Sequence, residues 1–229
     1  MDKIGRLTGK VALVTGAGTG LGRAIAISFA KAGATVILNG RREEKLREVA
    51  KEIGEGCFII PADLTKESEV NTLVDELQKN TAGELDILVN NAGDVNAMEP
   101  IEKMSLEQWQ QMFDLNLTTQ FLTTRAFLPL LRKSEHGKII SVTSGMVNFF
   151  MKGMGAYSAS KAAVEALMKT VAEEEKDNGI QVNLFDPLNV VSEGNPNGKY
   201  EPAEIVDVLV DLAGADSVQQ HGEIVKPEV

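Results

Sequence analysis

A tyrosine, a lysine and a serine in the second half of the chain have the types and spacing of a proton-transfer site. Tyr157 and Lys161 are four residues apart in a stretch with helical character, which places both side chains on one helix face, one turn apart. An ammonium group near a phenol favours the phenolate and lowers its pKa. Tyr157 would then donate a proton to a forming alkoxide or accept one from an alcohol. The spacing by itself is common on helix surfaces and is weak evidence.

Ser144 strengthens this interpretation because it follows a predicted strand over residues 138–142 and precedes Tyr157 by 13 residues. Ligands of parallel sheets bind at the carboxyl ends of the strands. A hydroxyl at such a position can hold and polarise a carbonyl oxygen. The three residues together predict acid–base chemistry on a carbonyl compound or an alcohol.

A glycine-rich turn follows the first predicted strand, residues 11–14, and leads directly into a predicted helix over residues 21–32. Glycine permits a tight turn and a close approach of ligand to backbone, and the helix N-terminus offers N–H groups and a positive dipole end to a pyrophosphate. The pattern T-G-x-x-x-G-x-G differs from G-x-G-x-x-G, yet its position predicts a dinucleotide site rather than a merely tight turn. The expected contacts are Gly16, Gly18, Thr19, Gly20, Leu21 and Gly22.

The end of the second predicted strand, residues 35–38, bears on which dinucleotide binds. An acidic residue there would bind the ribose 2′-hydroxyl of NAD, but this position lacks one, and Arg41 and Arg42 follow. A guanidinium matches the shape and charge of a 2′-phosphate. The two arginines therefore predict NADP(H) rather than NAD(H). The alternative is a solvated helix start in which they pair with Glu43 and Glu44.

Short apolar runs alternate with longer amphipathic stretches along the whole chain. Continuous apolar strands joined by helices are typical of a parallel sheet covered on both faces. The expected strands are residues 11–14, 35–38, 57–60, 86–89, 138–142, 180–184 and 223–225. The expected helices are residues 21–32, 43–53, 66–79, 105–132 in two pieces, 156–176 and 202–213. We expect a single domain over residues 1–229.

Composition and charge exclude several classes of protein. The 229 residues suit one α/β domain, and the net charge of -10 disfavours binding to nucleic acid or to an anionic membrane. Cys57 is the only cysteine, and the two histidines, His136 and His221, lie far apart, so neither a disulfide nor a metal site is expected. The absence of an apolar leader and of a bilayer-length apolar run predicts a cytoplasmic protein.

In their order along the chain, these motifs resemble those of the short-chain dehydrogenases/reductases, in the single-domain branch that includes the 3-oxoacyl-acyl-carrier-protein reductases. The resemblance covers about residues 7–192. It implies a Rossmann-type doubly wound parallel sheet of about seven strands, and hydride transfer between NADP(H) and a carbonyl or secondary alcohol. It also implies a small-molecule or carrier-bound substrate and a homo-oligomer, either a tetramer or a dimer. The motifs that carry it are Thr15 to Gly22, Asp63, Asn90-Asn91-Ala92-Gly93, Asn116, Ser144, Tyr157 to Lys161 and Pro187.

The resemblance also implies a role for each matching residue. Tyr157 would transfer the proton, Ser144 would orient the substrate oxygen, and Lys161 would hold the nicotinamide ribose. Asn116 would hold a water that relays protons through Lys161, although taken alone it fits a buried helix kink equally well. Further cofactor contacts are expected at Asp63, Leu64, Asn91, Ala92, Gly93, Pro187 and Ser192.

After Pro187 the chain departs from the family pattern. Leu188 replaces a glycine, and leucine tolerates positive φ badly. Ser192 replaces a threonine and keeps its hydroxyl, and the usual helical lid is reduced to residues 193–201. The shortened loop predicts an open site, a bulky or carrier-bound substrate, or weak activity. The alternative function is a dinucleotide-binding sensor or scaffold with little or no turnover.

Two apolar regions remain to be placed. The Met- and Phe-rich segment 146–154 would form an adaptable lip over the site, or else pack in the core or against another subunit. The helical stretches over residues 108–131 and 156–172 are apolar enough to supply a symmetric interface.

Overall fold

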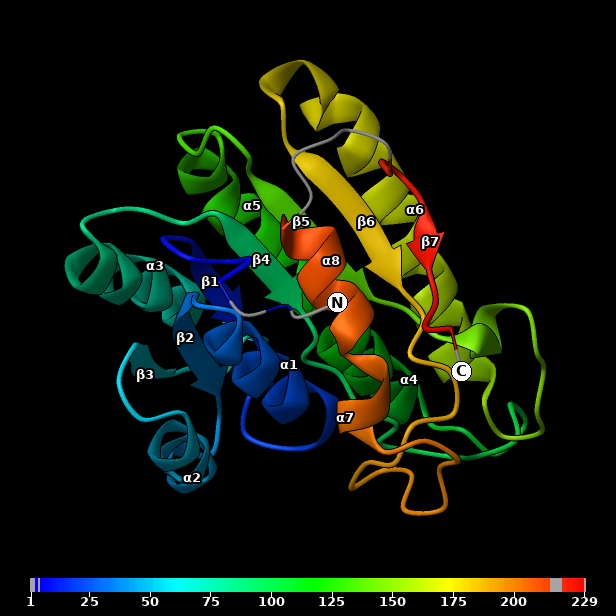
Figure 1. Cartoon of the computed structure of the whole chain (residues 1–229). Coiled ribbons are helices and arrows are strands. Elements are labelled where there is room, and N and C mark those ends of the chain that lie inside the picture. The colour runs from blue at the N-terminus through cyan, green and yellow to red at the C-terminus, as the bar shows by residue number, and fades with distance from the viewer. Residues whose placement is uncertain (1–2, 4, 215–219, 229) are drawn as a thin grey trace.

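The computed structural model describes residues 3, 5–214 and 220–228. Within this range the chain forms one sheet of seven strands in the order β3-β2-β1-β4-β5-β6-β7 (Figure 1). Every neighbouring pair is parallel, which confirms the predicted fold class. The strands are β1 (Val11–Val14), β2 (Thr35–Gly40), β3 (Cys57–Pro61), β4 (Ile87–Asn90), β5 (Lys138–Val142), β6 (Gln181–Phe185) and β7 (Ile224–Val225).

The helices connect these strands largely where the periodicity predicts them. They are α1 (Gly20–Lys31), α2 (Glu43–Ile53), α3 (Glu67–Thr81), α4 (Leu106–Phe113), α5 (Thr119–Leu131), α6 (Gly155–Glu175), α7 (Pro202–Ile205) and α8 (Asp207–Gly214). A π-helical turn, η1 (Asp114–Thr118), joins α4 to α5, and 3-10 turns η2 (Gly145–Val147) and η3 (Lys176–Asn178) flank α6. The helix predicted over residues 202–213 is therefore interrupted after Ile205.

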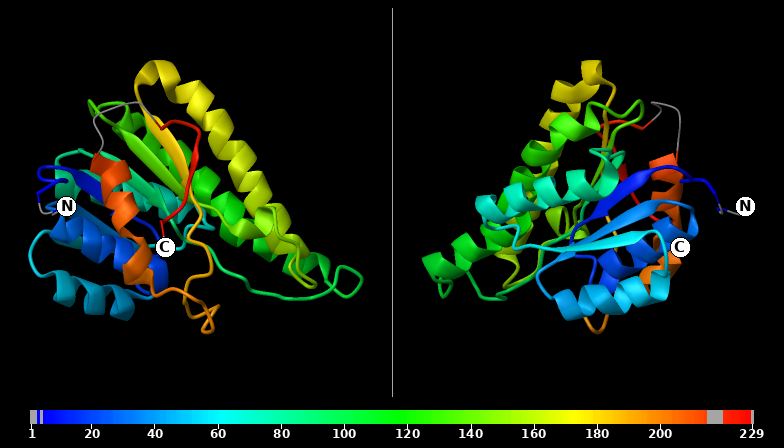
Figure 2. Two further views of the ribbon diagram at one scale, coloured as in Figure 1. Left: turned by 45° about the vertical axis from the view of Figure 1, so that its right-hand side comes forward. Right: turned by 90° about the vertical axis from the view of Figure 1, so that its left-hand side faces the viewer.

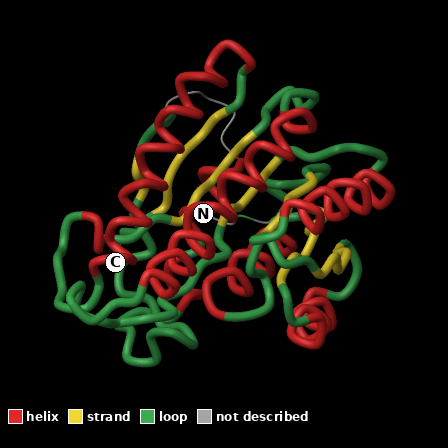
Figure 3. The backbone as a smooth tube through the Cα atoms, turned by 180° about the vertical axis from the view of Figure 1, so that it is seen from behind, coloured by secondary structure: helices red, strands yellow, loops and turns green. Residues whose placement is uncertain are grey.

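Both faces of the sheet are buried, and the alternation of side chains along each strand explains how. In β1, Ala12 and Val14 join the cluster beneath α1, α2, α7 and α8, whereas Val11 and Leu13 join the cluster beneath α3, α5 and α6, because successive strand residues point to opposite faces. Figures 1 and 3 show the two helical layers from opposite sides. No helix among the described residues is long and apolar enough to cross a membrane.

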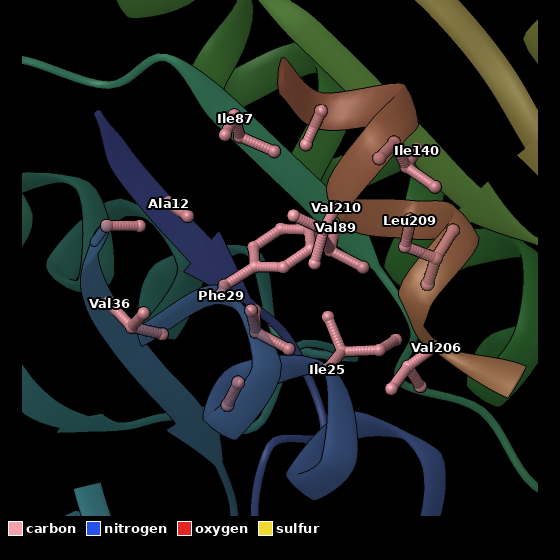
Figure 4. Packing of buried hydrophobic residues seen from close by; sticks show 14 of the residues in the cluster. Ala12, Ile25, Phe29, Val36, Ile87, Val89, Ile140, Val206, Leu209 and Val210 are labelled. Carbon is pink, nitrogen blue, oxygen red and sulfur yellow. The ribbon is translucent and has the colours of Figure 1, made fainter. Parts of the chain in front are cut away.

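Packing on the first face fixes the position of α1, the helix that follows the glycine turn. Ile25 and Phe29 of α1 are fully buried against the residues around α8, including Val206, Leu209 and Val210 (Figure 4). Burying large apolar side chains of this kind stabilises a fold by about 1.5–3 kcal/mol each. The N-terminus of α1 is thereby held at the carboxyl end of β1.

The strand order reverses direction at the centre of the sheet. The chain runs outward from β1 through β2 to β3, and then returns to place β4 on the other side of β1. The connections that leave β1 and β4 therefore diverge, which opens a crevice at the carboxyl ends of the strands. Predicted site residues follow each of the strands β1 to β6 and so emerge at this edge, whereas Asn116 lies in η1 and Tyr157 and Lys161 lie in α6.

Candidate active site

The glycine turn between β1 and α1 has the geometry of an anion site. Gly16 adopts a left-handed φ of 64°, and a Cβ at position 22 would lie 2.2 Å from the Gly16 carbonyl oxygen. Among the described residues no side chain caps α1 at Thr19, and its first turn is free of acidic residues. The N-terminus of α1 therefore keeps its positive dipole end for a ligand, which fits the pyrophosphate of a dinucleotide.

Thr15 ties this turn to the segment after β4. Its hydroxyl donates to the Val89 carbonyl (3.0 Å) and accepts from the backbone N–H groups of Asn91 (2.9 Å) and Ala92 (3.0 Å). The Asn91 amide in turn donates to the Thr15 carbonyl over 2.9 Å. The turn and the β4 exit are thus held together across the central crevice.

Gly93, Asn116 and Lys161 meet at one point although they come from three different elements. A Cβ at position 93 would lie 2.6 Å from Asn116 Oδ1 and 3.6 Å from Lys161 Nζ. Asn116 lies in the π-turn η1, a type of irregularity frequent at functional sites. Its amide donates to the carbonyls of Asp94 (2.8 Å) and Met112 (3.0 Å) and accepts from the Asp94 N–H. The side chain thus braces the segment after β4, and its water relay stays a prediction.

Lys161 is a buried ammonium. It exposes only 3% of its surface, and its Nζ donates to the Val142 carbonyl at the end of β5 over 3.0 Å. Burial lowers the pKa of Lys161 from 10.5 to about 8, because an apolar environment disfavours the charged form. The lysine is still mostly protonated at pH 7.

Tyr157 has a raised pKa, which reverses the direction expected from its spacing to Lys161. Burial is the largest cause, the hydrogen bond with Ser144 acts the other way, and the carboxylates of Asp186 and Asp94 raise the pKa further. The Lys161 ammonium is 5.8 Å from the tyrosine ring centroid and donates to a carbonyl rather than to the phenol. In the unliganded protein the phenol is therefore protonated at neutral pH.

Asp186 is a buried residue of the site that no motif singles out; its only sequence signature is an acidic residue directly before Pro187. Its carboxylate accepts from the N–H groups of Gly145 (3.1 Å) and Leu188 (3.0 Å). The Lys226 ammonium lies 3.1 Å from its other oxygen. Leu188 has a φ of 59°, so the chain keeps the left-handed conformation of the missing glycine.

The two arginines after β2 are exposed at the edge of the crevice. Arg42 forms an ion pair with Glu193 across 2.7 Å, rather than with the glutamates that follow it. On the neighbouring strand exit, the Asp63 carboxylate accepts from the N–H and hydroxyl of Thr65. Leu64 beside it is buried.

The shortened loop over residues 193–201 starts beside the crevice, where a Cβ at position 194 would lie 2.9 Å from Asp94 Oδ1. It is held by hydrogen bonds from the N–H groups of Val191 to the Tyr200 carbonyl (2.9 Å) and of Lys199 to the Asn189 carbonyl (2.7 Å). A Cβ at position 20 would lie 3.6 Å from Ser192 Cβ, which places Ser192 beside the glycine turn. Pro187 is buried at the start of this connection.

The Met- and Phe-rich segment leaves large apolar side chains in solvent. Phe149 and Phe150 are 61% and 80% exposed, so the core-packing alternative is wrong for them. The exposed Ile101 lies against the start of α6, where a Cβ at Gly155 would be 2.8 Å from its Cδ1. Figure 2 shows the segments before α4 and before α6 running side by side beyond the sheet.

Comparison with known proteins points to one family. The short chain dehydrogenase family model matches residues 10–202. An oxidoreductase of Staphylococcus aureus strain MRSA252 is 33% identical over 96% of this chain and 98% of its own.

Two solved structures have nearly the same fold. A short chain dehydrogenase from Escherichia coli CFT073, complexed with NADPH, is 32% identical with a TM-score of 0.90 over 98% of both chains. The 3-ketoacyl-(acyl-carrier-protein) reductase of Brucella melitensis, complexed with NADH, is 28% identical with a TM-score of 0.90 over 96% of both chains.

Proposed function

Because the chain belongs to the short-chain dehydrogenase family, we propose that it is an NADP(H)-dependent enzyme that interconverts a carbonyl compound and a secondary alcohol, with Tyr157 as its acid/base. The observation that carries this proposal is the buried ammonium of Lys161, whose Nζ lies 5.8 Å from the ring centroid of Tyr157. The Ser144 hydroxyl lowers the pKa of the same phenol. Two hydroxyls beside a buried cation suit a substrate oxygen that gains negative charge.

The dinucleotide preference rests on the residues after β2. The E. coli CFT073 relative was crystallised with NADPH and the Brucella melitensis relative with NADH, so family membership is compatible with both. Here Arg41 and Arg42 offer two guanidiniums where NAD would need an acidic residue. The glycine turn would hold the pyrophosphate, with Ser192 beside it, and NADP(H) when bound supplies or accepts the hydride.

The chain's own groups then divide the proton chemistry. Tyr157 is protonated at neutral pH because its pKa is raised, so it acts as the acid that donates a proton to an alkoxide oxygen. Ser144 donates a hydrogen bond to the same oxygen, and Lys161 stabilises the phenolate left behind. In the opposite direction the phenol must first lose its proton, so alcohol oxidation is favoured only at high pH.

Replacing Tyr157 by phenylalanine tests this assignment. We expect the turnover number to fall by about 100-fold or more, the scale of general acid catalysis, while NADPH affinity stays close to that of the parent. Tyr200→Phe, the change at the chain's other tyrosine, is the matched control and should keep its activity. Undiminished turnover in Tyr157→Phe would exclude the phenol as the acid.

A sensor or scaffold remains the second candidate, favoured by one observation. Glu193, at the start of the shortened loop, forms an ion pair with Arg42, the residue that would otherwise bind a 2′-phosphate. A panel of ketones and alcohols with NADPH, combined with a binding titration, separates the two functions. Binding without turnover of any compound would favour the sensor.

The surroundings of the site support a further part of the proposal. The exposed Phe149 and Phe150 give the mouth an apolar lip, which suits a substrate with an apolar or carrier-linked portion.

A shallow depression along α5 and α6, lined by Leu117, Phe121 and Leu167 among others, is a suitable contact between two copies of the chain. We propose a cytoplasmic dimer or tetramer.

A further inference from the structure

Asp186 links three segments that are distant in sequence. Its Oδ1 accepts from Gly145, which starts the turn after β5, and from Leu188, which follows β6. Its backbone N–H donates to the Val225 carbonyl in β7 over 3.0 Å, and Lys226 pairs with its Oδ2. Only 3% of the residue is exposed, so these contacts account for a carboxylate buried beside the proposed site.

The contact with Leu188 compensates for a missing glycine. A left-handed φ is unfavourable for a non-glycine residue and persists only where the surroundings impose it. The Asp186 carboxylate accepts the N–H two residues ahead, which is the hydrogen bond of an Asx-turn. The same oxygen holds the N–H of Gly145, next to Ser144. One acceptor therefore fixes the turn that carries the substrate-orienting hydroxyl relative to the turn beside the dinucleotide crevice.

Charge provides a second, independent link from Asp186 to the reaction. The carboxylate acts on Tyr157 together with Asp94, which follows β4, while Lys161 is the cation on the tyrosine's own helix. Lys226, which follows β7, is the counter-ion of Asp186 and is half exposed. The electrostatic effect of Asp186 on Tyr157 therefore depends on the ion pair that Asp186 forms with Lys226.

We propose that Asp186 is a positioning residue of the reaction: it holds Leu188 in the left-handed conformation, fixes the Ser144–Gly145 turn, and uses Lys226 as its counter-ion. This inference rests on the proposed function, because Ser144 and Tyr157 are the groups on which it acts.

A double-mutant cycle tests the conformational part. In Asp186→Ala both N–H groups lose their acceptor, and we expect kcat to fall by about tenfold or more, since small displacements of reacting groups are costly. Glycine adopts positive φ without support, so adding Leu188→Gly should restore a large part of the lost kcat. Asp211→Ala, which removes an Asp–Lys pair far from the site, should leave kcat unchanged. A double variant as slow as Asp186→Ala alone would overturn the proposal.

The electrostatic part is tested without turnover by the tyrosinate absorbance. Tyr157 is the only tyrosine in a Tyr200→Phe background, so its ionisation is observed alone. Asp186→Asn keeps the oxygen acceptor and removes the charge, so the pKa of Tyr157 should fall. Lys226→Met leaves the carboxylate uncompensated, so the pKa should rise. Shifts in the same direction, or no shift, would overturn the proposal.

This design separates the two hypotheses. If the parent protein turns over no carbonyl or alcohol, the proposed function fails, while the titration still decides the role of Asp186. If the parent is active, the double-mutant cycle decides as well. Far-UV circular dichroism at each pH confirms that every variant is folded during the titration.

Discussion

Lys161→Met should make the fold more stable at neutral pH while it abolishes turnover. The lysine holds a positive charge, and among the described residues only the Val142 carbonyl accepts from its ammonium. Methionine is unbranched and of similar length, so it fills the space of the lysine stem without introducing a charge. The variant therefore isolates the cost of burying the ammonium.

The magnitude follows from the pKa of Lys161, which burial lowers from 10.5 to about 8. At about 1.36 kcal/mol per pKa unit, holding the charge in the folded state costs about 3 kcal/mol below pH 8. The lost hydrogen bond subtracts little, because the Val142 carbonyl also accepts from the Gln120 amide at 3.3 Å. We expect Lys161→Met to gain about 2–3 kcal/mol at pH 7.

The pH dependence has a defined sign. Between pH 8 and 10.5 the unfolded chain binds a proton at Lys161 that the folded chain does not bind, so the stability of the parent rises with pH in this window. The methionine variant lacks this dependence. Its advantage should shrink steadily from pH 8 and be nearly gone at pH 10.5.

Urea unfolding followed by far-UV circular dichroism, at pH 7 and at pH 9.5 and at equal protein concentration, measures both quantities. Lys169→Met, at an exposed lysine of the same helix, is the control and should change stability by no more than about 0.5 kcal/mol. The reasoning is refuted if Lys161→Met is less stable than the parent at pH 7, or if the difference between them is independent of pH.

Three further changes test other parts of the site. Gly22→Ala should abolish NADPH binding in a fluorescence titration, because its Cβ would lie 2.2 Å from the Gly16 carbonyl oxygen; normal binding would contradict the geometry of the turn. Arg42→Ala should raise the KM for NADPH by about tenfold or more, the value of a charge-assisted hydrogen bond, and leave the KM for NADH unchanged; equal effects on both would exclude a 2′-phosphate contact. Phe121→Glu should shift the protein to a smaller species in sedimentation velocity if the α5–α6 face joins two subunits, and an unchanged species would place the interface elsewhere.

Local patterns were sufficient to predict the sheet and much of the site. Buried parallel strands are continuous apolar runs and amphipathic helices repeat every 3.6 residues, so both appear in any short window of sequence. The glycine turn is local as a sequence pattern, whereas its close contacts include Asn91, Ala92 and Ser192 from much later segments. Strand order then brings Asn91, Ser144 and Tyr157 to one edge, as the alternation of strands and helices predicts.

Other features depend on contacts between residues that are far apart in the chain. Arg42 pairs with Glu193, which lies 151 residues away at the start of the shortened loop. Leu188 keeps a glycine-like conformation because its N–H donates to the Asp186 carboxylate. That carboxylate is held in place by Gly145 and Lys226. The spacing of these residues gives no indication that they meet.

The sequence alone predicted the reaction chemistry that we propose, because residue type and helical spacing decide which groups can share a face. Only the tertiary structure decided the protonation of Tyr157 and Lys161. A pKa depends on burial and on every charge that reaches the group through the folded protein. Spacing predicted a lowered pKa for the phenol, whereas the fold buries it beside two carboxylates and raises that pKa.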